Sequence, residues 1–436
     1  MTFPIGRQGQ NTRLRIWREA NFATRPDPVT SVHDLPFAVS GYGFGSTEEQ
    51  GQSQKMPRGS NPMRPPRGYL RASGPLPLLA EEAVLGLLFE RFFDQYVPRG
   101  ATSQSITCAN VEVGDNITLT VGGINTVFTA AAAESIPARE FKCEDDFSWT
   151  NAQTANSLKN VIDGHADFSA EGATFPPFIT VIATPAPAAP ITGTSSNGTR
   201  LAIVGVAPFH HMFKLLSAAP AAKSMGMEEW DAAASKGDQF DGVLVAGIEI
   251  TARKEPSDFV VRFQLEGCGA VLLDEAAQVS ETPELHAGQL FSLLNISALI
   301  DTVAALAVDE IQLSIRREIT WKYPMDGLRR ATYPLPGGCT IEGSITGVFD
   351  TTSLIRELAD GESHSVLISL PLIGDDDKKL IFKLDEVDAF RQSAPTIDGP
   401  GERQVTVQIA PHHTSGADGS AFSVQLLNGV ETYVDW

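Results

Sequence analysis

The segments VLVAGIEIT (Val243 to Thr251) and FVVRFQL (Phe259 to Leu265) decide the fold class of this 436-residue chain. Both are apolar or alternate apolar with polar residues, and the stretch Arg253 to Asp258 between them has the character of a turn. Val, Ile and Phe favour extended backbone, so two such runs around a turn predict a pair of β-strands.

Five further segments show the same period of two. They are Glu310 to Trp321, Cys339 to Phe349, Ser365 to Leu372, Leu380 to Leu384 and Gln404 to Ile409. Short alternating strands separated by turn residues predict an all-β sandwich or barrel. Helix signals are few and lie at Leu78 to Phe93, Ala152 to Asp163, Glu228 to Ala234 and Thr352 to Leu358.

Residues 100–200 have the pattern of a separate small α+β module. Val111 to Thr120 and Thr126 to Ala130 are predicted strands on either side of Gly122-Gly123, which suits a tight turn. Asn151 can cap the helix that follows. Because the module begins and ends beside the flanking β sequence, we interpret it as an insertion.

A weak internal repeat relates the two ends of the chain. Arg67 to Leu78 (RGYLRASGPLPL) and Pro336 to Gly347 (PGGCTIEGSITG) align at an offset of 269 residues, which places Gly74 on Gly343. Identity is slight, but each segment follows a Pro-rich loop and precedes a helix signal and paired strands, which indicates one β unit used twice. We expect two tandem β-sandwich or barrel units with a flanking helix each, at 1–99 with 201–275 and at 276–436, and the inserted module at 100–200.

Composition and charge exclude several classes of protein. The chain has 33 Lys and Arg against 53 Asp and Glu, a net charge of −20, and the acidic surplus lies after residue 100. This balance argues against a tightly held nucleic-acid partner, because phosphate binding needs clustered basic residues. No stretch is apolar enough to predict a membrane helix or a secretory signal. The four cysteines lack zinc or disulfide spacing.

No motif predicts a catalytic site. His210-His211 and His412-His413 are adjacent pairs, and neighbours on a strand point to opposite faces, so one metal cannot easily take both rings. The glycine-rich stretch Gly41 to Gly45 has no following Lys, and no dinucleotide fingerprint, nucleophile elbow or metalloprotease helix occurs. We therefore predict no enzyme, no metal and no cofactor.

The order of elements resembles that of the major tail tube proteins of long-tailed (siphovirus-like) bacteriophages. Those proteins often have an Arg-rich loop, a strand with a spaced Gly pair and an LGLLL-type helix, which match Tyr42 to Pro66, Gly68 to Leu78 and Val84 to Phe89 here. The second half of their pattern matches Ile311 to Trp321, Gly343 to Thr346, Phe349-Asp350 and Gln404 to Ala410. The insert is similar to small β modules of phage structural proteins through Gly114 to Thr118, Val121 to Gly123 and Asn151 to Leu158.

This resemblance implies a structural protein of the virion, located in the phage tail and assembled in the host cytoplasm. A doubled unit implies homotrimeric rings with pseudo-sixfold symmetry, stacked into a tube. The tube would enclose the tape-measure protein and later pass DNA, with the tail terminator and distal tail proteins as further partners. Acidic side chains lining such a channel would repel phosphate, although the same surplus could serve solubility alone.

Two other readings remain open at this point. One is another virion protein, either a tail terminator or a capsid decoration protein. The other is a β-sandwich that binds glycans, which calls for aromatic side chains gathered on a strand face. The five tryptophans are scattered along the chain, which counts against it.

The Arg-rich segment is the candidate contact between stacked rings. It is too polar and too rich in Gly and Pro to form a core, yet it is basic in an otherwise acidic chain, which suits contact with the acidic surface of a neighbouring copy. The alternative is a solvated tether without a partner. The candidate contact residues are Lys55, Arg58, Arg64, Arg67 and Arg71.

Overall fold

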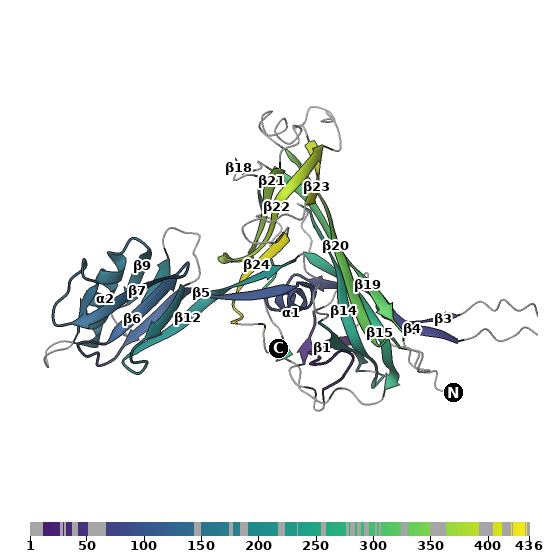
Figure 1. The fold of residues 1–436 in the computed structure, drawn as a ribbon, viewed down its shortest axis with the longest axis horizontal. Coiled ribbons are helices and arrows are strands. Elements are labelled where there is room, and N and C mark those ends of the chain that lie inside the picture. The colour runs from purple at the N-terminus through teal and green to yellow at the C-terminus, as the bar shows by residue number, and fades with distance from the viewer. Residues whose placement is uncertain are drawn as a thin grey trace, which may run out of the picture. The chain divides into compact units, whose positions relative to one another are not determined.

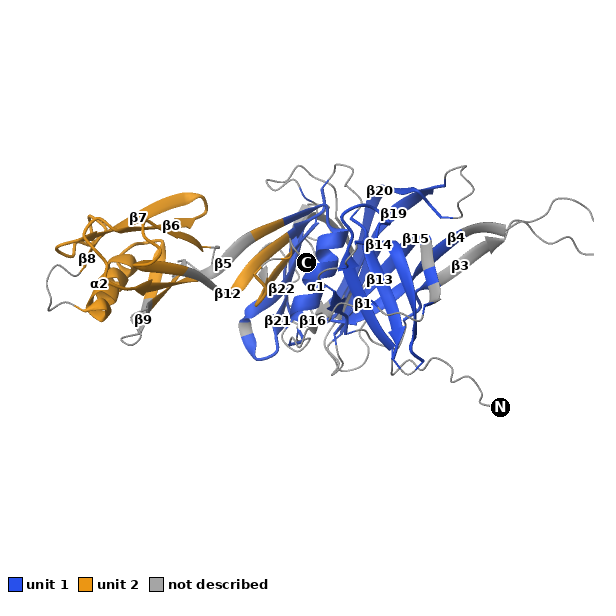
Figure 2. Cartoon of the chain, turned by 90° about the horizontal axis from the view of Figure 1, so that it is seen from below, with its two compact units in different colours: residues 1–96, 213–424, 434–436 blue, residues 97–212, 425–433 orange. Residues whose placement is uncertain are grey.

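The computed structural model describes most of the chain (Figure 1). The described residues are 12–26, 29, 32–36, 42–50, 67–143, 150–173, 178–183, 191–216, 223–232, 234–253, 259–275, 279, 284–285, 289–291, 296–300, 303–304, 307–323, 330–348, 363–391, 404–411, 420, 422–431 and 433. Two compact units are distinguished in Figure 2: unit 1 comprises 1–96, 213–424 and 434–436, and unit 2 comprises 97–212 and 425–433.

The expected all-β fold with few helices is confirmed. Unit 1 contains one described helix, α1 (Glu82–Phe92). Its strands are β1 (Thr12–Arg18), β2 (His33–Asp34), β3 (Gly45–Gln50), β4 (Arg67–Leu79), β13 (Met225–Asp231), β14 (Lys236–Arg253), β15 (Val260–Glu275), β16 (Glu284–Leu285), β17 (Ser297–Ile300), β18 (Val303–Ala304), β19 (Ala307–Lys322), β20 (Tyr333–Val348), β21 (Ser363–Leu372), β22 (Asp375–Arg391) and β23 (Gln404–Pro411). The chain passes between the units along β5 (Gln95–Cys108), β12 (Leu201–Lys214) and β24 (Phe422–Asn428).

One antiparallel sheet organises unit 1. Its strands follow the order β3, β4, β15, β14, β19, β20, β23 and β22. β13 pairs with the first half of β14, and β21 pairs with β22. The seven segments that sequence periodicity predicted as strands all lie in this sheet or beside it, since β21 carries Ser365 to Leu372.

Two sets of strands within this sheet share their order and their register. β3, β4, β15 and β14 form the first set, and β19, β20, β23 and β22 form the second. In the first, Leu79 is opposite Val260 and Gly74 is opposite Leu265. In the second, the residues 269 positions after Leu79 and Gly74, which are Val348 and Gly343, lie opposite Gln404 and Ile409. The residue pairs of the hairpin β3–β4 recur in the hairpin β19–β20 at the same offset of 269 residues: Gly45 is opposite Ser73, and Ser314 is opposite Glu342.

Helix α1 covers the apolar face of the sheet. Leu85, Leu88 and Phe89 are fully buried, and the ring of Phe89 lies 6.0 Å from that of Phe263 on β15. The sequence predicted the helix from Leu78, but it begins at Glu82. β4 continues to Leu79 because its ladder with β15 extends that far, and tertiary pairing overrides local propensity.

Unit 2 has a core of its own. The sheet β11 (Ile191–Ser195), β6 (Asn116–Val121), β7 (Ile124–Ala131) and β8 (Glu140–Lys142) packs with α2 (Asn151–Asp163), β9 (Phe168–Ala173) and β10 (Phe178–Ala183) around buried apolar side chains. Gly122 and Gly123 have φ of 59° and 82°, so the predicted tight turn between β6 and β7 is confirmed. The α2 cap is Thr150, which forms a capping box with Gln153, whereas the expected cap, Asn151, accepts a hydrogen bond from the Asn110 amide.

The helix predicted at Glu228 to Ala234 is wrong, because β13 occupies Met225–Asp231. This strand pairs with β1 on one side and β14 on the other. Glu228 is fully buried and accepts hydrogen bonds from Arg15 (3.3 Å) and Gln239 (2.8 Å). A buried carboxylate needs such partners, and only the assembled sheet supplies them.

Replacing Gly74 by Ala should destabilise unit 1 by ~3 kcal/mol. Gly74 has φ of 155°, and a Cβ there would overlap the carbonyl of Gly43. Gly45 on the neighbouring strand has open space around an added Cβ, so Gly45→Ala should change stability by no more than ~0.5 kcal/mol. Urea unfolding of both variants measures the difference, and equal effects would contradict the predicted clash.

Replacing His211 by Gln should flatten the pH dependence of unit 2 stability. His211 is fully buried, and its Nε2 lies 2.7 Å from the carbonyl oxygen of Val430. Burial lowers the pKa of His211 to about 4. As the pH falls, the histidine of the unfolded chain is protonated at a higher pH than the buried histidine of the folded chain. The free energy of unfolding of the wild type should therefore decrease by ~2 kcal/mol between pH 7 and pH 5.

Calorimetry of unit 2 unfolding at pH 7 and pH 5 measures this loss. His165→Gln is the control, because it replaces a partly exposed histidine of the same unit by the same residue. A wild type equally stable at both pH values would contradict the prediction.

Candidate functional site: a polar sheet face and open strand edges

The described part of the chain offers neither a cluster of metal ligands nor a membrane-spanning helix. Among these residues, no group of three or more His, Cys, Asp or Glu side chains could hold a metal ion. No described helix has the length and apolar character needed to cross a bilayer. His412-His413 lies outside the described residues. Unit 1 presents two further features, the polar face of its sheet and its open strand edges.

Strict alternation along the strands gives the sheet two different faces. On β19, Ile311, Leu313 and Ile315 are buried, while Gln312 and Arg316 are exposed on the other side. β15 follows the same rule, with Val261, Phe263 and Leu265 buried. Successive side chains of a strand point to opposite faces, so the period of two read from the sequence produces this division.

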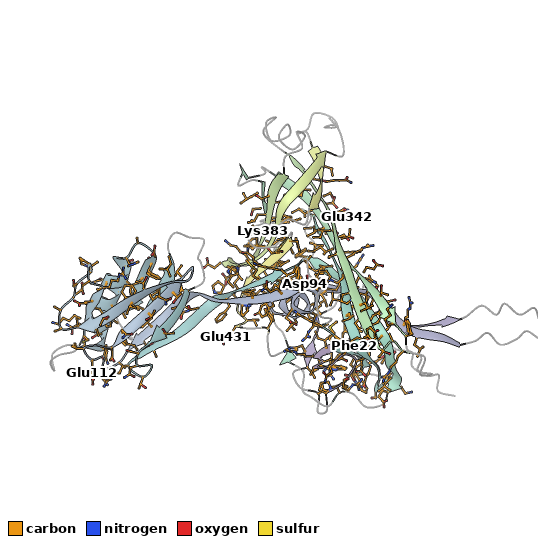
Figure 3. All side chains as sticks on the ribbon, in the orientation of Figure 1. Phe22, Asp94, Glu112, Glu342, Lys383 and Glu431 are labelled. Atoms are coloured by element: carbon orange, nitrogen blue, oxygen red, sulfur yellow. The ribbon has the colours of Figure 1, made fainter. Side chains whose placement is uncertain are left out.

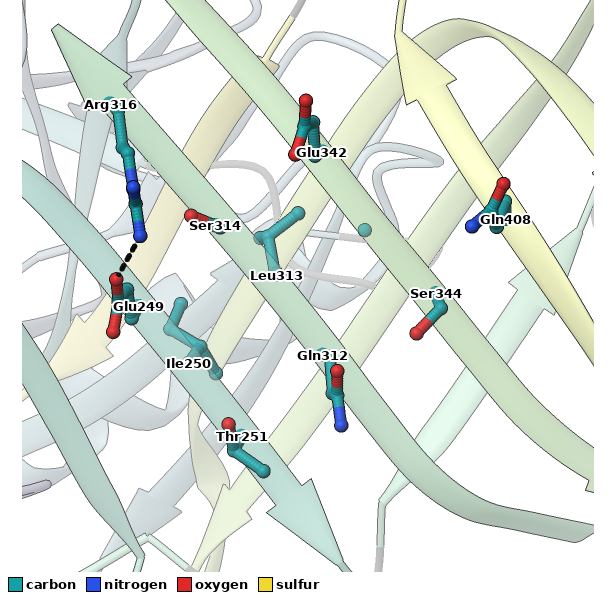
Figure 4. Close-up of a pocket in the computed structure, with 11 residues that line it drawn as sticks. Glu249, Ile250, Thr251, Gln312, Leu313, Ser314, Arg316, Glu342, Ser344 and Gln408 are labelled. Carbon is teal, nitrogen blue, oxygen red and sulfur yellow. Dashed lines mark hydrogen bonds and ion pairs between the residues drawn. The ribbon is translucent and has the colours of Figure 1, made fainter.

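The polar face contains a concavity of about 400 Å³ across β14, β19, β20 and β23 (Figure 4). Figure 4 shows the polar side chains of Gln312, Ser314, Glu342, Ser344 and Gln408 along these strands. Gly343 lies among them and contributes no side chain, which deepens the surface at that point. The concavity holds hydroxyls, amides and charges, without an aromatic platform for a sugar or a base.

Ion pairs cross the polar face where β14 meets β19. The Arg316 guanidinium lies 2.7 Å from Glu249 (Figure 4), and Arg253 lies 2.8 Å from Glu310. A hydrogen bond from Gln312, assisted by Arg253, lowers the pKa of Glu310. Glu249 and Arg253 belong to β14, whereas Arg316 and Glu310 belong to β19. Each strand therefore contributes one acidic and one basic side chain to the seam.

The described polar face carries both signs of charge. Its basic residues are Arg71, Arg253, Arg262 and Arg316, and its acidic residues are Glu249, Glu266, Glu310 and Glu342. The acidic surplus of the chain is therefore not concentrated on this face. Any repulsion of an anion here is weaker than the net charge of −20 suggests.

A buried ion pair joins the opposite side of β19 to the end of α1. Arg317 donates to Asp94 across 2.6 Å, and its guanidinium lies 5.4 Å from the centre of the Phe92 ring. Asp94, labelled in Figure 3, also accepts a hydrogen bond from the Leu216 amide. Arg317 and Asp94 side chains are only 8% and 4% exposed, so each ion depends on the other.

Two strands leave backbone without a described partner strand. β3 pairs with β4 alone among the described strands. β22 pairs with β21 on one side as far as Asp388, and with β24 and β23 on the other side, so that only its end beyond Asp388 is open on the β21 side among the described strands. Exposed edges of this kind accept a strand from another chain.

The structure locates only part of the predicted Arg-rich contact. Lys55, Arg58 and Arg64 lie outside the described residues, and Arg67 begins β4. Arg71 lies on the polar face, where its Nε donates to the Tyr323 hydroxyl across 3.0 Å. Sequence reasoning missed the Arg317–Asp94 pair. The alternation that buries Ile311, Leu313 and Ile315 also places Arg317 on the buried face, but nothing in the sequence indicates that Asp94, 223 residues away, is its partner.

A sheet with one polar face and open strand edges can add strands from another chain. The sequence matches the family described as phage tail tube protein over residues 9–410, nearly the whole chain. The chain belongs to this family. It is a structural protein of the bacteriophage virion, and it assembles with itself into a tail tube. Comparison with curated proteins returns no match.

Replacing Arg317 by Ala should destabilise unit 1 by about 3–5 kcal/mol, because it leaves Asp94 buried without its ion partner. The matched control is Arg316→Ala, which removes the neighbouring arginine on the exposed face. Its side chain is 70% exposed, so the loss should be ~0–1 kcal/mol. Thermal and urea unfolding of both variants distinguishes them, and similar losses would refute the role given to Arg317.

Proposed function

We propose that the chain forms homotrimeric rings of pseudo-sixfold symmetry, which stack into the tube of a siphovirus-like tail. The repeated register of the two strand sets carries this proposal. Each set would supply one tube unit, the first from 1–99 with 201–275 and the second from 276–436, so three chains would supply six units.

The seam between β14 and β19 supplies the template for ring closure. The first half of β14 pairs with β13, and its second half, Gly247 to Arg253, pairs with β19. In the second set, β22 occupies the place that β14 has in the first set. In the first set, β3 occupies the place that β19 has in the second. The end of β22 would therefore pair with β3 of the next copy. Closure of this kind removes the open edges and yields a barrel around a channel.

The polar face would line that channel, since the other face is covered by α1. A conduit must let its contents move. Basic side chains in isolation would hold DNA through phosphate contacts. Here Arg253 and Arg316 are paired with carboxylates, so their charge is largely satisfied. Such a lining suits passage of the tape-measure protein and then of DNA, and it involves no enzymatic step.

The remaining parts of the proposal concern surfaces outside the channel. The module at 100–200 would lie on the outer wall, where its bulk cannot obstruct passage. Its separate core supports this, because an inserted domain with its own core leaves its host intact. The Arg-rich residues Lys55, Arg58, Arg64, Arg67 and Arg71 would bind the acidic surface of the next ring. Tail terminator and distal tail proteins would close the ends.

Replacing Ser46 by Pro should block ring closure while leaving the subunit folded. The Gly43 amide donates to Pro75 on β4, so in the alternation of an antiparallel pair the amide of Ser46 points to the open side of β3. Proline removes that donor without disturbing the β3–β4 ladder. Electron microscopy should show tubes for the wild type and only free subunits for the variant.

Ser46→Ala is the control and should assemble like the wild type. The wild-type reconstruction also counts the chains in a ring. Six chains, or no closed ring, would overturn the trimer, and tubes from Ser46→Pro would overturn the edge assigned to β3.

A further inference from the structure

Two large apolar side chains stand exposed on one strand of unit 1. Tyr333 and Leu335 on β20 are 50% and 44% exposed, while Pro334 between them is buried. Residues two apart on a strand point to the same face, so the two side chains are neighbours. Two adjoining exposed apolar side chains on one strand form a small patch that contact with another protein would cover. We call Tyr333 and Leu335 the apolar pair.

The strand that carries the apolar pair is itself an edge. β19 accompanies β20 from Tyr333 onward, but β23 pairs only with Gly343 to Val348. Among the described strands, the first half of β20 therefore has a neighbour on one side only. Pro334 and Pro336 lie in this half, and proline in a sheet is tolerated where its nitrogen faces the open side of an edge. The edge resists strand addition, so a partner must dock through side chains.

We propose that the apolar pair is a contact between stacked rings, and that its occupant is another copy of this chain. This inference rests on the proposed ring. The half of β20 paired with β23 belongs to the barrel wall, and the opposite half runs beyond it toward the strand end. Strand ends of a barrel lie at its rims, and in the proposed stack the next ring would meet this one at a rim.

The two strand sets give this rim two different chemistries. The residues 269 positions before Tyr333 and Leu335 are Arg64 and Pro66, within the basic segment. In the sequence, the apolar pair of one set therefore corresponds to basic residues in the other. This rim of the proposed ring would alternate between the two kinds of contact. A ring then matches its neighbour after a threefold rotation but not after a sixfold one, which fixes the rotation between rings.

The test is the double variant Tyr333→Ser with Leu335→Ser, compared with the wild type by negative-stain microscopy and sedimentation. Isolated rings should still form, while the protein concentration needed for tubes should rise at least tenfold. Apolar contacts are not screened by salt, so the defect should persist at moderate salt. Changing Lys55, Arg58, Arg64, Arg67 and Arg71 to Ser should instead give a defect that shrinks as salt rises.

Two further variants make the comparison specific. Ile124→Ser removes an apolar side chain that is 68% exposed on unit 2, and it should leave tube formation unchanged. Tyr333→Leu with Leu335→Met keeps the pair apolar and should restore tubes. Should thermal unfolding show that the double Ser variant is destabilised, Leu335→Ser alone decides the question, with the same expected loss of stacking.

The outcomes separate this inference from the proposed function. A wild type that forms tubes, with a double Ser variant that forms them equally well, would overturn the apolar pair and leave the ring intact. A Tyr333→Leu, Leu335→Met variant as defective as the Ser variant would also overturn it. A wild type that forms neither rings nor tubes would overturn the proposed function, and the stacking contact with it.

Discussion

The pairing of β14 with β19 is the constraint on which unit 1 depends. Gly247 to Arg253 lie antiparallel to Glu310 to Arg316, and this ladder makes one sheet from two sets of strands that are distant in sequence. A slip of β19 by one residue along β14 would turn Ile315 out to solvent and bring Arg316 into the core. The register is therefore held by burial on one face, and the other face is left free for polar residues.

The ion pairs along this seam act within that constraint. Glu249 with Arg316 and Arg253 with Glu310 are substantially exposed, so each adds little to stability. These ion pairs instead shape the electrostatics of the polar face, because each pairs a positive with a negative side chain there. The buried ion pair of Arg317 and Asp94 lies on the other face of β19 and joins this strand to the end of α1. Adjacent arginines thus serve different faces of one strand.

Sequence reasoning failed where burial in the assembled sheet outweighed local preference. Glu228 to Ala234 has the polar composition of a surface helix. Its first residues nevertheless form part of the strand β13, because this strand pairs with β1 on one side and β14 on the other. Gly226 in that strand leaves room for the buried indole of Trp17, which nothing in the sequence foretells. The cap of α2 shifted by one residue to Thr150 because a capping box satisfies two backbone donors at once.

The sequence by itself determined the all-β class, the seven strands with period two and the offset that relates Gly74 to Gly343, because alternation and turn residues act locally. Tertiary structure alone decided which strands pair. That β4 meets β15 as β20 meets β23, that Asp94 is the partner of Arg317, and that the end of β20 stays open among the described strands depend on contacts between residues far apart in the chain. Such contacts have no local signature, because a strand presents the same pattern to every partner.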